Sequence, residues 1–399
     1  MKFNNIKDME LENKKVLVRV DYNVPLKKGM VEDDTRLKAT IPTINFLLEK
    51  NCKIILMSHL GRPKDLLKKG KSLEDAKREL SLRPVADDLS ELLGIDVGFV
   101  DDCIDVKIPE DKDVVLLENL RLHAEEEKDD MEFAKKLAEN GEVYVNDAFG
   151  NCHRNHASVS AITKLMPSCA GFLVEKENEQ LSRLLNPEKP FVAIVAGAKE
   201  DKIGALKILA KKADKILIGG VLANTFLKAK GYGIGSSKFD EETFKVAGEI
   251  IKIAGNKLKL PLDVVVADKF SDDANAKNVD AEDMDIEGWM ALDIGPKTIE
   301  SYREELKNAK TVFWAGPLGV FEMQKFCKGT KQIGEFLGSL NATVIVGGGD
   351  TAAAINVFEL ADNITHVSTG GGASLEFIEN EGRLPALVAL EEAKNSTVL

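Results

Sequence analysis

Short apolar runs alternate along the chain with stretches of helical periodicity. The apolar runs are four to six residues long and almost uninterrupted, which is typical of strands buried on both faces of a parallel sheet. Ten strands are more than one sheet of ordinary size holds, so we expect an α/β fold with two units. The expected strands are 15–20, 53–57, 113–117, 142–146, 191–196, 215–218, 264–267, 311–314, 343–346 and 365–368, and the helical patterns include 36–49, 84–93, 131–140 and 205–213.

The boundary between the two units is expected near residues 172–190. Residues 173–185 form a polar, glutamate-rich helical pattern, which is typical of a helix that bridges two domains. The run Asn-Pro-Glu-Lys-Pro at 186–190 follows and breaks regular structure. The sequence therefore predicts domains over 1–172 and 188–385, with an interdomain helix over 173–187.

Charge and cysteine content limit the classes of partner. The formal net charge of −12 argues against general binding to nucleic acid or to an anionic membrane. The five cysteines are an odd number without Cys-x-x-Cys spacing, which is typical of reduced thiols in a cytoplasmic protein and not of a disulfide framework or a zinc site. The first ten residues are polar, and no apolar run approaches the ~20 residues of a membrane span, so we expect neither a signal peptide nor a membrane helix.

The most informative stretch joins an expected strand at 342–346 to an alanine-rich helix that starts near Thr351. Gly347, Gly348 and Gly349 at the join let the backbone approach a ligand, and the helix N-terminus offers free N–H groups to a phosphate. Asp350 would repel phosphate alone, but Mg²⁺ binds carboxylate and phosphate oxygens together. The stretch therefore indicates a metal–nucleotide site, and the alternative is a tight turn capped by Asp350 and Thr351.

In the first half, polar and cationic residues follow the ends of four expected strands. Because the carboxyl ends of parallel strands form the ligand crevice of an open sheet, these residues can converge there. Arginine suits bidentate binding of phosphate or carboxylate, so the set predicts a small polyanion as ligand. A single arginine after a strand is usually a surface residue, but the repetition favours a site. The candidates are Asp21, Asn23, Arg36, His59, Arg62, Arg121 and Arg154, with His153 and His156 less certain, while His123 is interpreted as structural and no metal site is expected from these histidines.

In the second half, glycines follow the ends of the expected strands at Gly197, Gly219, Gly316 and Gly370. No GxxxxGK[ST] motif is present, so this is not a P-loop fold. An anion-binding half joined to a nucleotide-binding half suits phosphoryl transfer, which depends on positioning, charge neutralisation and exclusion of water by a closing hinge.

Nine runs in these loops resemble phosphoglycerate kinase and occur in the family's order across essentially the whole chain. The runs begin at Arg19 (RVDYNVP), Ser58 (SHLGRP), Leu117 (LENLR), Asn146 (NDAFG), His153 (HRNHAS), Asp293 (DIGPKT), Gly316 (GPLGVFE), Gly347 (GGGDTA) and Ser368 (STGGGAS).

The resemblance implies reversible, Mg²⁺-dependent phosphoryl transfer between ATP and 3-phosphoglycerate in glycolysis, giving ADP and 1,3-bisphosphoglycerate. It implies two Rossmann-like α/β domains with parallel sheets facing each other across a cleft, with 386–399 returning to the first domain. A cytoplasmic monomer without nucleic-acid or membrane partners is expected.

The resemblance also assigns site residues by position. It implies a catalytic set of Arg36, Lys199, Lys202, Gly348 and Gly371, and a phosphoglycerate site of Asp21, Asn23, Arg36, His59, Arg62, Arg121 and Arg154. It implies a nucleotide site of Lys202, Gly295, Glu322, Gly348, Gly349, Asp350 and Thr351, in which Asp350 binds the metal of Mg–nucleotide and Glu322 the ribose.

Three departures from the family pattern all lie in the nucleotide half. The run from Lys199 to Lys202 is one residue shorter than the usual lysine spacing, Ala315 replaces an asparagine, and Val221 replaces a glycine. They leave open an alternative, a catalytically weak or regulatory paralogue that binds phosphoglycerate. A nicotinamide dehydrogenase is disfavoured because no GxGxxG run follows a strand.

Overall fold

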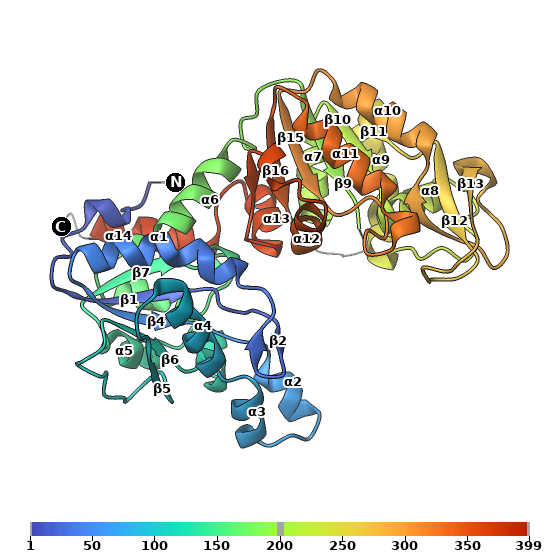
Figure 1. Cartoon of the computed structure of the whole chain (residues 1–399). Helices are drawn as coiled ribbons and strands as arrows, with labels where there is room; N and C mark the ends of the chain where they lie inside the picture. The colour runs from blue at the N-terminus through green and yellow to red at the C-terminus, as the bar shows by residue number, and fades with distance from the viewer. Residues whose placement is uncertain (1, 198–202, 397–399) are drawn as a thin grey trace. The chain divides into compact units, whose positions relative to one another are not determined.

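The computed structural model describes residues 2–197 and 203–396, which form two compact units (Figure 1). One unit consists of residues 1–179 and 383–399, and the other consists of residues 180–382. The last helix, α14 (Pro385–Ser396), belongs to the first unit, where the Ala386 N–H donates to the Cys152 carbonyl at 3.0 Å. The helix α6 (Phe172–Ser182) runs across the boundary between the units.

The first unit is built on a six-stranded sheet in the order β5-β6-β4-β1-β7-β8. Every paired strand in it is parallel. Its strands are β1 (Lys15–Val20), β4 (Lys53–Met57), β5 (Gly98–Val100), β6 (Val114–Leu117), β7 (Val143–Asp147) and β8 (Ser168–Ala170), with a short hairpin of β2 (Leu26–Lys27) and β3 (Met30–Val31). Its helices are α1 (Thr35–Glu49), α2 (Pro63–Lys68), α3 (Leu73–Glu79), α4 (Arg83–Leu93) and α5 (Met131–Ala138).

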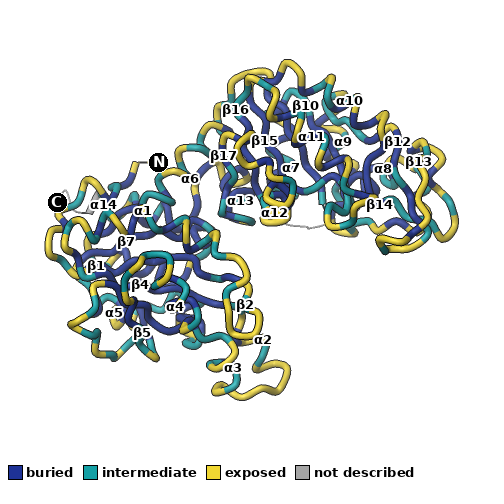
Figure 2. The backbone as a smooth tube through the Cα atoms, viewed as in Figure 1, coloured by how far each residue is buried: buried dark blue, intermediate teal, exposed yellow. Residues whose placement is uncertain are grey.

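The strands of this sheet are buried on both faces, as continuous apolar runs predict (Figure 2). On one face, Val16, Val18 and Val20 of β1 pack in a common core with apolar residues of α1 and α4. On the opposite face, Leu17 is also fully buried. With both faces covered, the free edge available for polar chemistry is the carboxyl end of the strands.

The second unit contains a six-stranded parallel sheet in the order β11-β10-β9-β15-β16-β17. Its strands are β9 (Phe191–Val195), β10 (Lys215–Ile218), β11 (Leu258–Lys259), β15 (Thr311–Ala315), β16 (Thr343–Gly347) and β17 (His366–Val367). Its helices are α7 (Ile203–Lys212), α8 (Gly220–Ala229), α9 (Glu241–Ala254), α10 (Pro296–Leu306), α11 (Lys328–Gly338), α12 (Gly349–Val357) and α13 (Gly372–Glu379).

A small antiparallel sheet departs from the expected pattern. The expected strand 264–267 is β12 (Asp263–Ala267), which pairs antiparallel with β13 (Ala276–Asp280) and β14 (Met290–Ile294) instead of joining the parallel sheet. An apolar run of this length does not specify the direction of its partners. The strand β13 lacked a sequence signal because its side chains are mostly exposed and polar.

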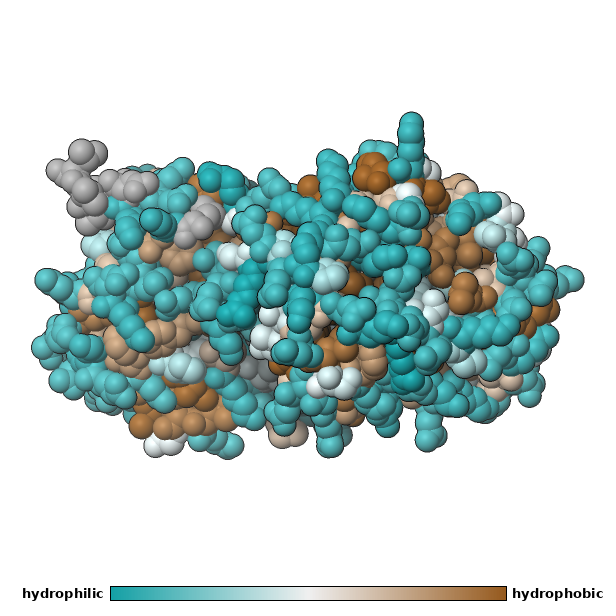
Figure 3. Space-filling model, turned by 90° about the horizontal axis from the view of Figure 1, so that it is seen from above, coloured by the Kyte–Doolittle hydropathy of each residue, from teal (hydrophilic) through white to brown (hydrophobic). Residues whose placement is uncertain are grey.

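The prediction of an α/β fold with two parallel sheets is confirmed. The face of the molecule in Figure 3 is mostly hydrophilic, with hydrophobic side chains in scattered groups. Within residues 2–197 and 203–396, no helix combines the length and the apolar character needed to cross a membrane.

Candidate active site

The loops after the parallel strands of the first unit bring several predicted residues together. Asp21, directly after β1, forms an ion pair with Arg36 of α1, and the Asp21 Oδ2 to Arg36 Nη1 distance is 2.5 Å. Asn23 Oδ1 accepts a hydrogen bond from the Gly61 N–H at 2.8 Å, which joins the loop after β1 to the loop after β4. These contacts join Asp21, Asn23 and Arg36 to the loop after β4 in one network at the carboxyl edge of the sheet.

Arg19 is a fully buried member of this network that the sequence did not single out. Its Nε donates to Ser158 Oγ at 2.9 Å, and its Nη2 lies 3.2 Å from His59 Nδ1. Because a guanidinium can only donate, His59 Nδ1 accepts and the proton of the neutral ring is on Nε2. Burial, and next the charge of Arg19, hold the pKa of His59 well below its usual range. His59 is therefore a neutral ring with a donor at Nε2.

Arg121 carries donor capacity that the protein itself does not use. Its side chain is only 3% exposed, and its Nη1 donates to the Gly61 carbonyl at 2.8 Å. Its Nε and Nη2 are buried without a hydrogen-bond acceptor among the described residues, and the nearest carboxylate, that of Glu127, is 3.5 Å from Nε. Burial and the charge of Arg154 lower the pKa of Arg121 to about 10, so it is still charged at neutral pH. A buried charged donor of this kind requires an acceptor, and an anionic ligand would supply one.

A cavity of about 310 Å³ lies beside this arginine. Arg62 and Arg154 line it together with Lys64 and Lys68, which are not among the predicted site residues. The lining residues are Arg62, Pro63, Lys64, Asp65, Lys68, Arg121, Glu127 and Arg154. Five cations against two carboxylates give the cavity a net positive charge in an acidic protein.

The two less certain histidines are neutral neighbours of the arginines. Arg154 Nε donates to His153 Nε2 at 3.1 Å. Burial and then Arg154 lower the pKa of His153 to about 4, and burial and then Arg19 lower the pKa of His156 to about 3. Both rings are therefore neutral at neutral pH and add no positive charge to the site.

A second cavity, of about 470 Å³, lies in the second unit at the carboxyl ends of its parallel strands. Gly197 follows β9, Gly220 follows β10 and Gly319 follows β15, and all three line it. A Cβ on Gly220 would lie 2.7 Å from the Gly197 nitrogen, and its φ is +59°, so this close approach requires glycine. The predicted residues Glu322 and Asp350 also line this cavity.

The glycine run after β16 forms the start of α12. Gly348 is the N-cap residue with φ +92°, and Asp350 lies in the first turn of the helix. The Thr351 hydroxyl is fully buried, where it accepts from the Gly316 N–H at 2.6 Å and donates to the Gly347 carbonyl at 3.0 Å. Its hydroxyl thus fastens two glycine loops together, and contact with a nucleotide would come from backbone groups.

Two other predicted glycines lie in different surroundings. Gly371 is the N-cap of α13 with φ +53°. Gly295 caps α10, and its absent Cβ leaves room for the Asp263 carboxylate, which would lie 2.3 Å from it. Gly295 is not among the described residues that line the cavity, whereas the neighbouring Asp293 is. The structure therefore gives Gly295 a packing role next to the cavity.

Asp293 is a second residue that the sequence did not select. It accepts from the Ile294 N–H and the Gly329 N–H, both at 2.9 Å. Burial raises its pKa to about 7. Its place at the start of one of the family-like runs was a signal that could have identified it.

The three departures from the family pattern have different positions. Val221 lines the cavity, so it places a side chain where the family has none. Ala315 ends β15 and is fully buried, with its carbonyl accepting from the Ala196 N–H at 2.8 Å. Lys199 and Lys202 lie outside the described residues.

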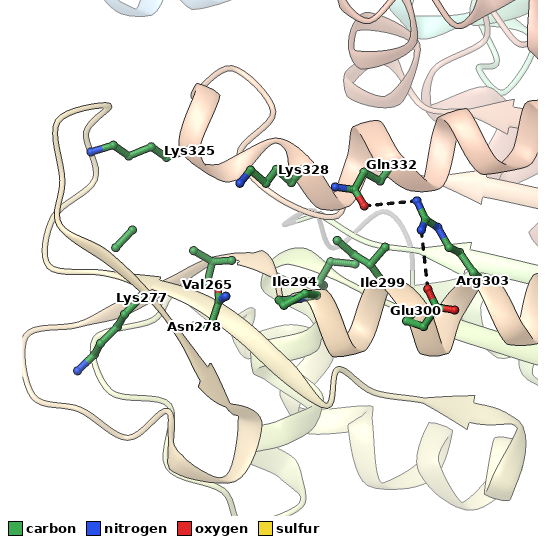
Figure 4. Close-up of a pocket in the computed structure, with 12 residues that line it drawn as sticks. Val265, Lys277, Asn278, Ile294, Ile299, Glu300, Arg303, Lys325, Lys328 and Gln332 are labelled. Carbon is green, nitrogen blue, oxygen red and sulfur yellow. Dashed lines mark hydrogen bonds and ion pairs between the residues drawn. The ribbon is translucent and has the colours of Figure 1, made fainter.

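A third cavity, of about 610 Å³, lies between α10, α11 and the small antiparallel sheet (Figure 4). Of its four cations, Arg303 interacts with Gln332 and Glu300, and the Lys277 and Lys325 side chains extend away from its centre. No predicted site residue within the described parts of the chain lines it. The candidate substrate sites are therefore the first two cavities, one in each unit.

Comparison with known proteins gives one consistent answer. A family model described as phosphoglycerate kinase matches residues 6–381. The chain is 49% identical over 398 residues to the phosphoglycerate kinase of Moorella thermoacetica, covering 97% of this chain and 98% of that one. It is 48% identical over 406 residues to that of Borrelia garinii subsp. bavariensis, covering 98% and 100%.

Solved structures agree with the sequence comparisons. The phosphoglycerate kinase of Coxiella burnetii matches with a TM-score of 0.85 at 38% identity, over 98% of this chain and 100% of that chain. The phosphoglycerate kinase of Pyrococcus horikoshii matches with a TM-score of 0.83 at 32% identity, over 98% and 99%.

Proposed function

The chain belongs to the phosphoglycerate kinase family, and from this premise we propose that each of its two units holds one of the two substrates. The activity is the reversible transfer of a phosphoryl group between ATP and 3-phosphoglycerate. The relatives carry this name at nearly half identity over almost their full length. Nothing in the comparisons favours the alternative of an inactive paralogue.

The phosphoglycerate site is the basic cluster of the first unit. The observation that carries this assignment is the buried guanidinium of Arg121, whose Nε and Nη2 have no hydrogen-bond acceptor among the described residues. It lines a cavity together with Arg62 and Arg154. A phosphate and a carboxylate on a three-carbon body match several forked donors converging from different loops. Asp21, Asn23 and the Nε2–H of His59 complete the set with groups suited to the substrate hydroxyl and carboxylate.

The nucleotide site is the glycine-lined cavity of the second unit. Gly197, Gly220 and Gly319 let the backbone approach a flat base and a ribose, and Glu322 offers a carboxylate to the ribose hydroxyls. Gly348 and Gly349 begin α12, whose N-terminus suits phosphate. We assign Lys202 and Gly371 to the phosphate groups on family position.

The residues present fit Mg²⁺ bound through the nucleotide. Asp350 is exposed, lines the cavity and lies in the first turn of α12. One carboxylate plus phosphate oxygens is a common binding mode for Mg²⁺, which keeps several waters. When bound, the ion would neutralise charge on the phosphates.

The reaction needs no proton transfer from the substrate to the protein. The acceptor carboxylate of 3-phosphoglycerate is already ionised, so no general base is needed. Arg36, with Lys199 and Lys202, would stabilise the charge of the transferring group. Water must be kept from that group, so we expect hinge closure during turnover. We also propose a cytoplasmic monomer.

Isothermal titration calorimetry of the intact protein tests whether the two substrates bind at separate sites, one in each unit. Arg121→Gln should weaken binding of 3-phosphoglycerate at least about tenfold, since hydrogen bonds to charged groups contribute about 1.5–3 kcal/mol. Binding of MgADP should be unchanged. Arg78→Gln is the matched control, because Arg78 is exposed and pairs only locally with Asp75. Equal affinity of Arg121→Gln for 3-phosphoglycerate would remove the assignment.

A further inference from the structure

A cluster of three potential metal ligands lies outside both substrate sites. Asp102 and Cys103 follow β5, and His123 lies in the loop after β6. Because β5 and β6 pair in parallel, with Val100 opposite Leu117, their carboxyl ends bring the two loops together. A carboxylate oxygen of Asp102, the Cys103 sulfur and a His123 ring nitrogen all lie within 4.8 Å of one another.

The chemistry of the donors is that of a transition-metal site. A thiolate, an imidazole and a carboxylate are the ligands that Zn²⁺ takes, and three protein ligands with one water is a common arrangement. Bond lengths of about 2.3 Å to sulfur and about 2.0 Å to nitrogen place tetrahedral ligand atoms about 3.3–3.6 Å apart. The observed separation of within 4.8 Å needs only small side-chain rotations to reach this.

The surroundings support the ligands and leave an entry path. His123 Nε2 already lies 2.7 Å from Asp102 Oδ1, so the ring is aimed at the cluster. Asn140 Nδ2 donates to the Cys103 carbonyl at 3.1 Å, and the Cys103 N–H donates to Asp102 Oδ1 at 2.7 Å, which holds the loop in place. The Asp102 and His123 side chains are 46% and 26% exposed, so two of the three ligands are reached from solvent, whereas Cys103 is buried.

The local charge also favours a cation. The Asp102 and Glu126 carboxylates both lie close enough to the Cys103 thiol to interact with it electrostatically. A divalent cation would bind as the thiol loses its proton to solvent, so that one S–H bond is exchanged for one metal–sulfur bond.

We propose that Asp102, Cys103 and His123 form a binding site for a divalent transition metal of the zinc class, with water as the fourth ligand. The sequence did not predict it, because the carboxylate and thiol precede the histidine by about twenty residues and come from another loop. The site lies apart from the nucleotide-bound Mg²⁺, which prefers oxygen ligands. An ion here would link the loop after β5 to the loop that carries Arg121.

Cobalt substitution of the full-length, chelator-treated protein under reducing conditions tests the proposal. Co²⁺ should bind with a stoichiometry of one, give visible d–d bands and a thiolate-to-cobalt band in the near ultraviolet, and be displaced by Zn²⁺. Loss of an outer-shell partner costs about 10- to 100-fold in metal affinity, so Cys103→Ser and His123→Gln, which remove ligands, should weaken binding at least about 100-fold. Cys327→Ser should bind Co²⁺ as the wild type does, because Cys327 is the more exposed thiol and lies in the other unit.

Kinase turnover of each variant without cobalt shows whether it is folded. A second measurement needs no variant: Zn²⁺ should slow alkylation of Cys103, followed by mass spectrometry, and leave alkylation of Cys327 unchanged. Absence of the thiolate band, its persistence in Cys103→Ser, or equal alkylation of Cys103 with and without Zn²⁺ would overturn the proposal.

Discussion

Asp21 Oδ2 and Arg36 Nη1 lie 2.5 Å apart, so the residue with the most demanding proposed role is held by a carboxylate before substrate binds. The Arg36 side chain is 35% exposed and the Asp21 side chain 11%, which makes the pair partly desolvated. A guanidinium has five donors, and one ion pair leaves most of them for a ligand. The ion pair therefore orients the Arg36 side chain and leaves most of its N–H donors available to bind a ligand.

Arg36→Gln should lower kcat about 100- to 1,000-fold, which is the usual effect of removing one donor to developing charge. The KM for 3-phosphoglycerate should rise less, since other arginines still bind the substrate. Steady-state kinetics with varied 3-phosphoglycerate measures both. Lys38→Gln is the control, because Lys38 is on the same helix and pairs only with Asp34 at the surface. A kcat for Arg36→Gln within a few-fold of the control would contradict the proposed role.

His153 and His156 should remain neutral across the physiological range. Burial lowers the pKa of His153 to about 4 and that of His156 to about 3, with Arg154 and Arg19 respectively as the next causes. Nitrogen-15 NMR of the His153 and His156 imidazoles should therefore show neutral rings from about pH 8 down to about pH 5. Arg154→Gln should raise the pKa of His153, because it removes the adjacent positive charge. A ring of His153 or His156 that titrates near its ordinary pKa of about 6.5 would contradict the burial argument.

Thr351→Val should destabilise the second unit by about 1–3 kcal/mol, because the Gly316 N–H then loses its acceptor in a buried position. Urea unfolding followed by tryptophan fluorescence measures this selectively, since Trp289 and Trp314 are the two tryptophans of the chain and both lie in that unit. ADP affinity should fall as well, because the hydroxyl fixes the glycine loops. Thr351→Ser keeps the hydroxyl and should retain most of the stability. Equal stability of the Val and Ser variants would rule out the linking role.

The buried carboxyl of Asp147 predicts a pH dependence of stability. Burial raises its pKa to about 7, its Oδ1 accepts from the Leu173 N–H at 2.9 Å, and its Oδ2 is without a partner in the described structure. Between the unfolded pKa of about 4 and the folded pKa of about 7, the native state binds more protons than the unfolded state. The contribution of Asp147 to the free energy of unfolding is therefore complete below about pH 4 and is lost as the pH rises through about 7.

Asp147→Asn removes this titration while keeping an oxygen for the Leu173 N–H. The variant should gain stability relative to the wild type as the pH rises from about 5 to about 8, in urea unfolding followed by circular dichroism. Asp105→Asn, at the surface, is the control. A constant difference between Asp147→Asn and the wild type at all pH values would show that Asp147 does not titrate in this range.

The sequence predicted best what depends on burial. The strands β1, β4 and β10 occupy the predicted residues, because a strand covered on both faces must be continuously apolar. The strand β13 was missed because its side chains face solvent, and an exposed polar strand is specified by its partner β12. The antiparallel pairing of β12 was not predicted for the same reason, because it depends on partner strands that the residues of β12 do not specify.

The candidate site was predictable where function depends on position after a strand. Arg62, Arg121 and Arg154 were found this way and line one cavity. Arg19 was missed because it lies inside β1, where its neighbours indicate core, and because its partner Ser158 is distant in the sequence. A buried charge is specified by the three-dimensional set of groups that satisfies it, and no spacing rule in the chain encodes that set.

The two lysines after β9 provide the sharpest test of how this chain differs from the family pattern. Lys202→Ala should lower kcat more than Lys199→Ala, because Lys202 matches the second lysine of the family run and the one-residue shortening falls between the two. Loss of a cation that faces the transferring group should cost about 100-fold or more, whereas loss of the other should cost less. Lys211→Ala is the control, since Lys211 is exposed on α7. Steady-state kcat of the three variants at saturating MgATP and 3-phosphoglycerate measures the order. The reverse order would mean that the shortened run has exchanged the roles of the two lysines. The transition state is stabilised by whichever cation reaches the equatorial oxygens of the transferring group, regardless of its position in the sequence.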